Sequence, residues 1–158
     1  MNKLRFRSGQ VHLVKVPVDP TTVIEAGDLV WLDTTGAKPA SAFPWTTNSA
    51  TTQAAFAGKF LGVAHQHSAA GNSDPVSVDI SSMSVYDFDT PPATYKLGDL
   101  LGPDNAASKL LDQQVATTVA ANAVARSVEF SAAGATTLRA TLASAFSTGS
   151  SNVNAQIG

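Results

Sequence analysis

One segment of the chain, Pro75–Ser81, alternates strictly between apolar and polar residues. Its apolar positions are Val76, Val78 and Ile80, and its polar positions are Ser77, Asp79 and Ser81. This period of two is typical of an antiparallel strand with one face buried and one face in water. The strand-like segment Phe60–His67 precedes it, across the small, turn-forming residues of Ser68–Asp74. The two segments are therefore predicted to pair as a β-hairpin.

Other strand-like segments lie on both sides of this hairpin. Leu29–Leu32 is a short apolar segment that follows a Gly-Asp turn. Two more strands are expected at Val124–Phe130 and Thr136–Ala143, joined by a turn at Ser131–Ala135. Residues 110–125 are ambiguous, because alanine and glutamine favour a helix whereas threonine and valine favour a strand. We predict a small all-β fold, a barrel or sandwich of antiparallel strands.

The predicted β-barrel domain spans residues 21–146. An extended N-terminal arm or first strand precedes it at residues 1–20, and a flexible C-terminal tail follows it at residues 147–158. The tail is expected because serine, glycine and asparagine dominate its composition.

Residues 34–58 are predicted to form a long surface loop within the domain. Glycine, proline and a Thr/Ser/Asn/Ala-rich stretch dominate this segment, and loops of this length often bind partners. Its apolar residues are Phe43, Trp45 and Phe56. Trp45 either fixes the loop to the body or contacts a partner, because tryptophan is over-represented in interfaces. Phe43 and Trp45 are the candidate contact residues of the loop.

The N-terminal arm has a strongly basic character. It holds four of the ten basic residues of the chain, and no acidic residue precedes Asp19. The arm is either a first strand with a basic face in water or a segment that adds to the sheet edge of a neighbouring subunit or partner. The candidate partner-binding residues of the arm are Leu4, Arg5, Phe6, Arg7, Val14 and Val16.

Composition excludes several classes of function. The chain has 158 residues and a formal net charge of −2, so nothing in its overall charge indicates nucleic acid or an anionic membrane as a partner. It has no cysteine, which excludes disulfides, thiolate metal ligands and a cysteine nucleophile. No apolar run approaches the ~20 residues that span a bilayer. No apolar segment follows the basic N-terminal residues, so no signal peptide is expected.

His65 and His67 have the spacing of a metal-ligand pair. Residues two apart on a strand share a face, so two imidazoles can converge on one ion. The spacing is similar to the first cupin motif, but no acidic residue follows within Ser68–Ser73, and the remaining histidine, His12, lies in the arm. A structural role is expected, with no metal or cofactor, and a metal-dependent enzyme built on His65 and His67 is kept as an alternative.

Acidic residues concentrate in the middle of the chain. They are Asp74, Asp79, Asp87, Asp89, Asp99, Asp104 and Asp112. Asp87 and Asp89 share a strand face and are a possible pair of catalytic carboxylates, but solvated acids are the preferred interpretation, with Asp79 on the polar face of its strand. The basic arm and this acidic region are expected to attract each other between copies of the chain. No phosphate-binding glycine loop and no Gly-x-Ser-x-Gly elbow occurs, so no catalytic residue is assigned and no enzyme is predicted.

Several short motifs follow one another in a characteristic order. They are GDLVWLD at 27–33, FLGVA at 60–64 before VSVDI at 76–80, GDLLGP at 98–103, and ARSVEF with SAAGATTLRATL at 125–142. In this order the chain resembles the small β-barrel capsid decoration, or cement, proteins of tailed bacteriophages. The resemblance covers about Val23 to Leu142.

This resemblance implies a structural virion protein without enzymatic activity. Such a protein binds the outer surface of an assembled phage capsid and stabilises it, with the major capsid protein as its partner. It is expected to be a homo-oligomer, with a trimer favoured, and to lie on the capsid exterior after synthesis in the cytoplasm of the bacterial host. The alternative is another β-type virion component, such as a fibre, a spike base or a carbohydrate-binding module.

Overall fold

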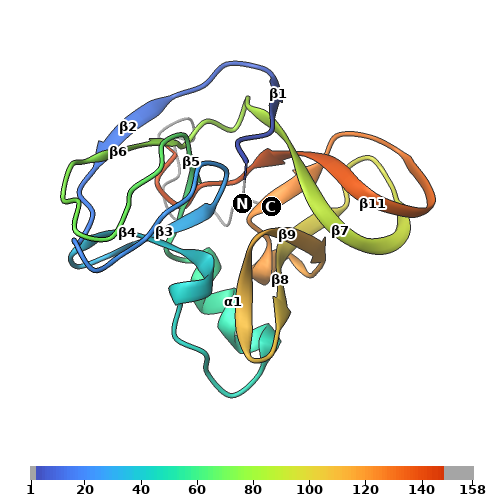
Figure 1. Ribbon diagram of the computed structural model, residues 1–158. Coiled ribbons are helices and arrows are strands. Elements are labelled where there is room, and N and C mark those ends of the chain that lie inside the picture. Colours follow the sequence, from blue (N-terminus) through green and yellow to red (C-terminus); the bar gives the residue numbers. More distant parts are fainter. Residues whose placement is uncertain (1–2, 148–158) are drawn as a thin grey trace.

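The computed structural model describes residues 3–147, which form mostly β-strands in two sheets (Figure 1). The predicted all-β fold is confirmed. The first sheet has the strand order β2-β6-β5-β3-β4 and is antiparallel throughout. Its strands are β2 (Leu13–Val16), β3 (Leu29–Asp33), β4 (Gly36–Pro39), β5 (Phe60–Ala64) and β6 (Val76–Asp79).

The second sheet has the order β1-β7-β11-β10-β8-β9. Its strands are β1 (Phe6–Ser8), β7 (Val85–Tyr95), β8 (Leu100–Ala106), β9 (Lys109–Thr117), β10 (Ala125–Ser127) and β11 (Ser131–Leu142). A parallel bridge between Asp89 and Gln114 also joins β7 to β9. The strands β7, β11, β10, β8 and β9 therefore form a closed five-stranded barrel, and β1 lies beside the start of β7.

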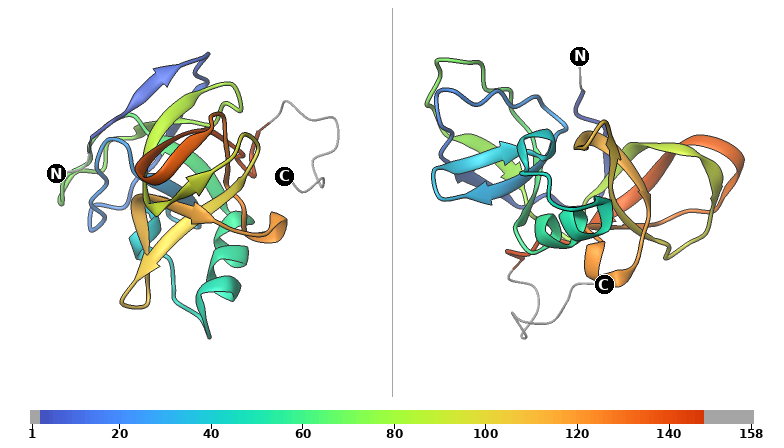
Figure 2. Two further views of the ribbon diagram at one scale, coloured as in Figure 1. Left: turned by 90° about the vertical axis from the view of Figure 1, so that its right-hand side faces the viewer. Right: turned by 90° about the horizontal axis from the view of Figure 1, so that it is seen from below.

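The inner strands β3, β5 and β6 of the first sheet are largely buried on both faces, whereas Leu13 and Lys15 of the edge strand β2 are exposed. The sheet curls so that the amide of Ala37 on β4 donates to the carbonyl oxygen of Pro17, the residue after β2, at 2.9 Å. The inner face of this curl holds one apolar cluster, which includes Val30 and Leu61. The other face packs on the barrel through a second cluster, which includes Trp31 and Phe60. Figure 2 shows the two sheets side by side from two further directions. Burial on both faces explains why β3 and β5 read as continuous apolar runs.

The predicted hairpin of β5 and β6 is confirmed, but the expectation of a solvated face on β6 is wrong. Val63 pairs with Asp79, and Ala64 pairs with Val78, in antiparallel register. Ser77 and Asp79, the polar residues of β6, are both buried. Asp79 faces the start of β7 instead of water, since the hydroxyl of Tyr86 donates to it.

The prediction of a long surface loop at residues 34–58 is wrong. This segment contains β4, a 3₁₀ helix η1 (Ala40–Ala42) and the helix α1 (Ser49–Ala57). Asn48 caps α1, because its side chain accepts a hydrogen bond from the amide of Thr51 at 2.9 Å. Phe56 on α1 is fully buried in the cluster between the sheets, so the segment belongs to the core.

The C-terminal strands begin and end at other residues than the pattern predicts. The ambiguous residues 110–125 form most of β9 and a 3₁₀ helix η2 (Ala120–Asn122), and β10 is only three residues long. The expected turn at Ser131–Ala135 is the start of β11, where register irregularities accommodate Gly134 at φ +85°. Of the predicted tail, residues 148–158 lie outside the described part of the chain. No helix within residues 3–147 is both long and apolar enough to cross a membrane.

Ser68 offers a test of the packing beside the first sheet. Within residues 3–147 its hydroxyl is buried and has no hydrogen-bond partner. A buried hydroxyl without a partner loses its hydration and gains nothing in return. We therefore expect Ser68→Ala to leave the free energy of unfolding unchanged or to raise it by about 1 kcal/mol in urea titrations.

The matched control is Ser127→Ala. The hydroxyl of Ser127 is as buried as that of Ser68, but it donates to the carbonyl oxygen of Glu129 at 2.9 Å. This substitution removes a satisfied hydrogen bond and should lower the free energy of unfolding by about 1 kcal/mol. Equal losses in the two variants would show that Ser68 has a partner after all.

Candidate functional site

The N-terminal arm packs on the body of its own chain. β1 pairs with β7, and β2 pairs with β6. The amide of Lys3 donates to Gln113 Oε1 at 3.3 Å, and the carbonyl oxygen of Arg5 accepts from the amide of Asp87 at 3.0 Å. The arm thus supplies the first strands of both sheets. Contact of the arm with a neighbouring subunit stays a prediction.

The charges of the arm are paired within the chain. Arg5 forms an ion pair with Asp89 at 2.7 Å, and Arg7 forms one with Asp87. Arg139 of β11 approaches the same Asp87 carboxylate at 3.6 Å. Both aspartates are thus paired with basic residues of the same chain; the side chain of Asp89 is still 52% exposed, whereas that of Asp87 is only 15% exposed. These partly exposed pairs orient the arm, but each contributes no more than about 1 kcal/mol.

The structure separates the apolar candidates of the arm into two groups. Leu4 and Phe6 keep 36% and 38% of their surface exposed. Val16, in contrast, is buried inside the curled first sheet, and Val14 packs against the same cluster. Because its side chain is in the core, Val16 cannot serve as a partner contact, and that assignment is wrong.

The loop candidates Phe43 and Trp45 lie on the core side of their segment. Phe43 is buried and makes edge-to-face contacts with Trp31 and Phe56, with ring centroids 4.8 and 5.4 Å apart. Trp45 is partly buried against the same cluster. Phe43 is therefore a core residue, which corrects its assignment as a contact residue. Trp45 fixes the segment to the body, one of the two roles expected for it.

A polar network beneath the arm joins β6 and β7 to His65, the residue that follows β5. The hydroxyl of Tyr86 on β7 donates to Asp79 Oδ2 of β6 at 2.6 Å, and His65 Nε2 lies 2.5 Å from the same hydroxyl. Asp79 Oδ1 accepts from the amides of His12 and Ser81, each at 2.9 Å. Asp79, expected in water, is fully buried. The sequence pattern did not reveal this network, because the alternation along β6 does not show that Tyr86 and His65 pack against Asp79.

The environment of the network shifts two pKa values. Burial lowers the pKa of His65 from its ordinary value, although the nearby Asp79 carboxylate opposes this shift. Burial and the hydrogen bond to Asp79 raise the pKa of Tyr86 well above its ordinary range. Tyr86 thus keeps its proton, which is directed at Asp79, and its oxygen is left to accept from His65.

His65 and His67 lie beyond the end of β5, so the face-sharing argument for a metal pair does not apply to them. His65 is partly buried in the network, whereas His67 is exposed. Within residues 3–147, no group of three or more His, Cys, Asp or Glu side chains is arranged to hold a metal ion.

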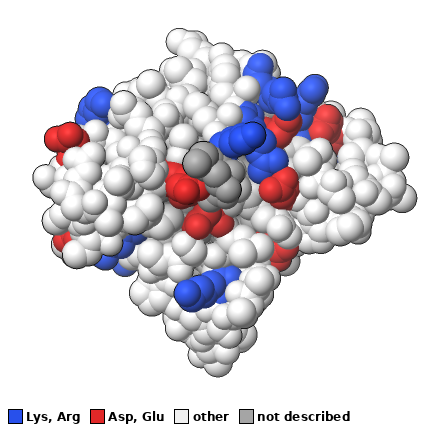
Figure 3. All heavy atoms as spheres, viewed as in Figure 1, with Lys and Arg blue, Asp and Glu red and all other residues white. Residues whose placement is uncertain are grey.

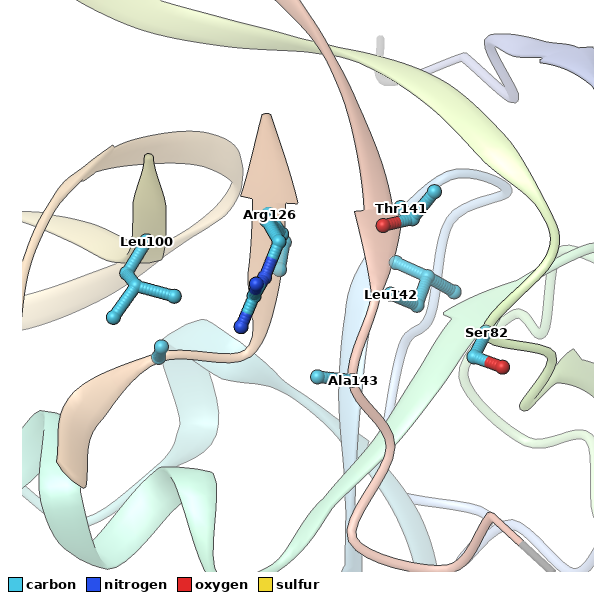
Figure 4. Close-up of a pocket in the computed structure, with 8 residues that line it drawn as sticks. Ser82, Leu100, Arg126, Thr141, Leu142 and Ala143 are labelled. Atoms are coloured by element: carbon cyan, nitrogen blue, oxygen red, sulfur yellow. The ribbon is translucent and has the colours of Figure 1, made fainter. Parts of the chain in front are cut away.

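A pocket of about 240 Å³ lies where the ends of β8, β10 and β11 meet (Figure 4). It is lined by Ser82, Leu100, Ala123, Ala125, Arg126, Thr141, Leu142 and Ala143. Figure 4 shows the guanidinium of Arg126 extending along β10 beside small apolar side chains. The lining contains one charged group and two hydroxyl groups but no general base, so it offers no basis for nucleophilic catalysis.

An uncharged flap projects from the barrel on the side of β7 and β11 that lies to the right in Figure 1. We define the flap as residues 90–95 and 130–137, which contain no charged side chain. The same side of the molecule is free of coloured charges in Figure 3. Phe130 in the flap is 75% exposed, and Leu97, just beyond it, is 58% exposed. The sequence pattern misassigned Phe130 to the strand Val124–Phe130, although the absence of charge around it is visible in the sequence.

The described residues thus offer a protein-contact surface more readily than a reactive centre. The candidate contact surfaces are the uncharged flap and, separately, the exposed apolar residues Leu4 and Phe6 of the arm. The chain matches none of the protein-family models and none of the curated proteins compared with it.

Proposed function

We propose that this protein is a capsid decoration protein, which binds the outer surface of an assembled phage capsid and stabilises the shell. The observation that supports contact with another protein is the uncharged flap with the exposed side chain of Phe130. The order of the sequence motifs supports a phage shell as the partner. The partner in this proposal is the major capsid protein, and the chain acts as a homo-oligomer, with a trimer favoured.

The flap has the chemical character of an interface. Exposed aromatic and aliphatic side chains that gather on one side of a soluble protein often mark interaction sites. The absence of charge lowers the cost of removing water from the flap when it packs against a partner. Phenylalanine also contributes a large apolar area to an interface.

Stabilisation of a shell follows from mass action. A protein that binds the assembled lattice, and not its free subunits, shifts the equilibrium toward the lattice. Each contact can be weak, because many equivalent contacts on a symmetric shell add together. This mode of action needs a folded β body and an exposed contact surface, and the exposed Phe130 on the flap supports such a surface.

The proposal predicts that Phe130→Ala weakens binding to expanded capsids of the phage from which the chain derives. Co-sedimentation should show at least a tenfold loss of apparent affinity, since a central aromatic contact is often worth more than 1.4 kcal/mol. Val119→Ala is the control, because Val119 is 64% exposed but lies outside the flap. Full occupancy of the shell by the Phe130 variant would exclude the flap as the contact surface.

Wild-type protein that fails to sediment with capsids would exclude the decoration function itself. A glycan array separates the carbohydrate-binding alternative, because a decoration protein is expected to show no specific sugar binding. Point variants test the contact surface better than deletion of residues 1–9, since β1 is part of the barrel sheet.

A further inference from the structure

We propose that protonation of His65 controls the docking of the N-terminal segment, residues 3–12, so that mild acid releases this segment from the body. The inference concerns the isolated chain and does not depend on the proposed function. Two features support it. Phe6 of the segment packs over His65, and a network of hydrogen bonds connects His65 to the segment.

Phe6 supplies the cover. Its ring centroid lies 5.6 Å from that of Tyr86, in an edge-to-face contact, and 6.5 Å from that of His65. The imidazole of His65 keeps only 15% of its side-chain surface exposed. Because Phe6 lies on β1, departure of the segment would open the imidazole to water.

The hydrogen bonds of Asp79 connect the imidazole to the other end of the segment. One carboxylate oxygen accepts from Tyr86, whose oxygen in turn contacts His65 Nε2. The other oxygen accepts from the amide of His12, which ends the segment before β2 begins. The segment is thus held at Phe6 and at His12 by two members of one network.

The direction of the effect follows from the proton positions. The hydroxyl proton of Tyr86 points to Asp79, so the neutral imidazole of His65 carries its proton on Nε2 and has a free Nδ1. An added proton on Nδ1 creates a cation beneath Phe6. Burial disfavours this cation and lowers the pKa of His65 while the segment is docked. In the released state the imidazole is in water and is protonated more easily.

This difference couples docking to pH. Docking has its full stability above the ordinary histidine value of 6.5 and loses stability as the pH falls through the lower value of the docked state. A single proton is involved, so the population of the released state at pH 5.5 can rise by at most about tenfold over that at pH 7.5.

The other groups around the network do not account for such a change. Tyr86 keeps its proton in this range, because burial and the hydrogen bond to Asp79 raise its pKa. Nζ of Lys15 on β2 donates to Oε1 of Gln66, the residue next to His65, at 2.9 Å. The imidazole of His12 is exposed on the segment itself, and therefore needs its own control.

Apart from the network, single hydrogen bonds hold the segment to the body, among them Lys3 to Gln113 at 3.3 Å and Ser84 to the carbonyl oxygen of Gln10 at 3.1 Å. β1 is three residues long and exposed at every position. Its ion pairs with Asp87 and Asp89 are partly solvated and therefore weak. Short, exposed elements open at much lower free energy than the core does.

The test is amide hydrogen exchange of the full chain between pH 7.5 and 5.5, corrected for the intrinsic pH dependence of exchange. The amide of Asp87 reports docking, since it donates to the carbonyl oxygen of Arg5. Its protection is expected to fall several-fold in wild type. His65→Gln should abolish this fall, because a glutamine amide can donate to Tyr86 but does not titrate. His12→Gln and His67→Gln should retain it.

A second measurement uses the cover itself. Phe6→Ala exposes the imidazole, so the titration midpoint of His65, followed by NMR, should move up toward the ordinary histidine value. Protection of the Asp87 amide that is constant with pH in wild type, or a fall that persists in His65→Gln, would overturn the proposal. An unchanged His65 midpoint in Phe6→Ala would overturn it as well.

Discussion

Replacement of Asp79 by alanine is expected to lower the free energy of unfolding by about 3 kcal/mol or more. The carboxylate is fully buried and accepts hydrogen bonds from the Tyr86 hydroxyl and from the amides of His12 and Ser81. Alanine leaves the buried Tyr86 hydroxyl and the two part-buried amides without their acceptor, and a fully buried unsatisfied donor costs about 1–3 kcal/mol. The relief from burying a charge offsets part of this loss. Urea denaturation followed by fluorescence or circular dichroism measures the difference.

Asp74→Ala is the matched control for this experiment. Asp74 is exposed, and the same substitution there should change the free energy of unfolding by no more than about 0.5 kcal/mol. Asp79→Asn should fall between the two, since the amide retains one acceptor oxygen but loses the charge. If Asp79→Ala costs no more than Asp74→Ala, the network does not stabilise the fold.

Phe56→Ala is the second substitution with a large expected effect, about 3–5 kcal/mol of lost stability. The side chain is fully buried between the two sheets, and its ring centroid lies 5.4 Å from that of Phe43 and 5.7 Å from that of Phe60. Removal of the ring leaves a cavity that the surrounding aromatic residues can fill only in part. The measurement is again urea denaturation. The unfolding midpoints of wild type and variant are compared, provided that both have the same m-value.

Phe130→Ala makes the same chemical change at an exposed site and serves as the control. Its effect on the free energy of unfolding should stay within about 0.5 kcal/mol. In the capsid co-sedimentation assay Phe130→Ala should have the larger direct effect of the two substitutions, because Phe130 lies in the proposed contact surface. A small effect of Phe56→Ala would mean that residues 34–58 are the surface loop which the sequence pattern indicates, and that α1 does not belong to the core.

Residues 34–58 show why local pattern can mislead. The nine-residue α1 is rich in alanine and threonine, and helices of this length are marginal in water without tertiary contacts. It forms because Asn48 caps it and Phe56 inserts between the sheets. Neither contact can be predicted from composition, which on its own suggests a loop.

The sequence and the structure also disagree about polar residues on strands. The period of two in β6 correctly predicts the strand and its apolar face. It also predicts that the other face is in water. This prediction is wrong, because alternation does not show which residues pack against that face. That face meets Tyr86, from the next strand along the chain, and Asp79 becomes a buried acceptor.

The candidate site was predicted only in part. The basic arm was identified from its charge, and Leu4 and Phe6 are exposed as a contact role requires. Val16 and Phe43 were misassigned because an apolar residue in a short segment looks the same whether it faces the core or a partner. The sequence pattern does not identify Phe130 as a contact residue, because it assigns Phe130 to a strand, whereas in the structure the side chain is exposed.

The sequence alone determined the all-β class, the hairpin of β5 and β6 and the basic arm, because alternation and charge are local properties of neighbouring residues. Only the tertiary structure decided which faces are buried, where the arm docks and which charges pair. These outcomes depend on contacts such as Arg5 with Asp89 and Tyr86 with Asp79, whose partners come from different strands. The free energy of such contacts is set by burial and geometry, which exist only once the sheets have closed around them.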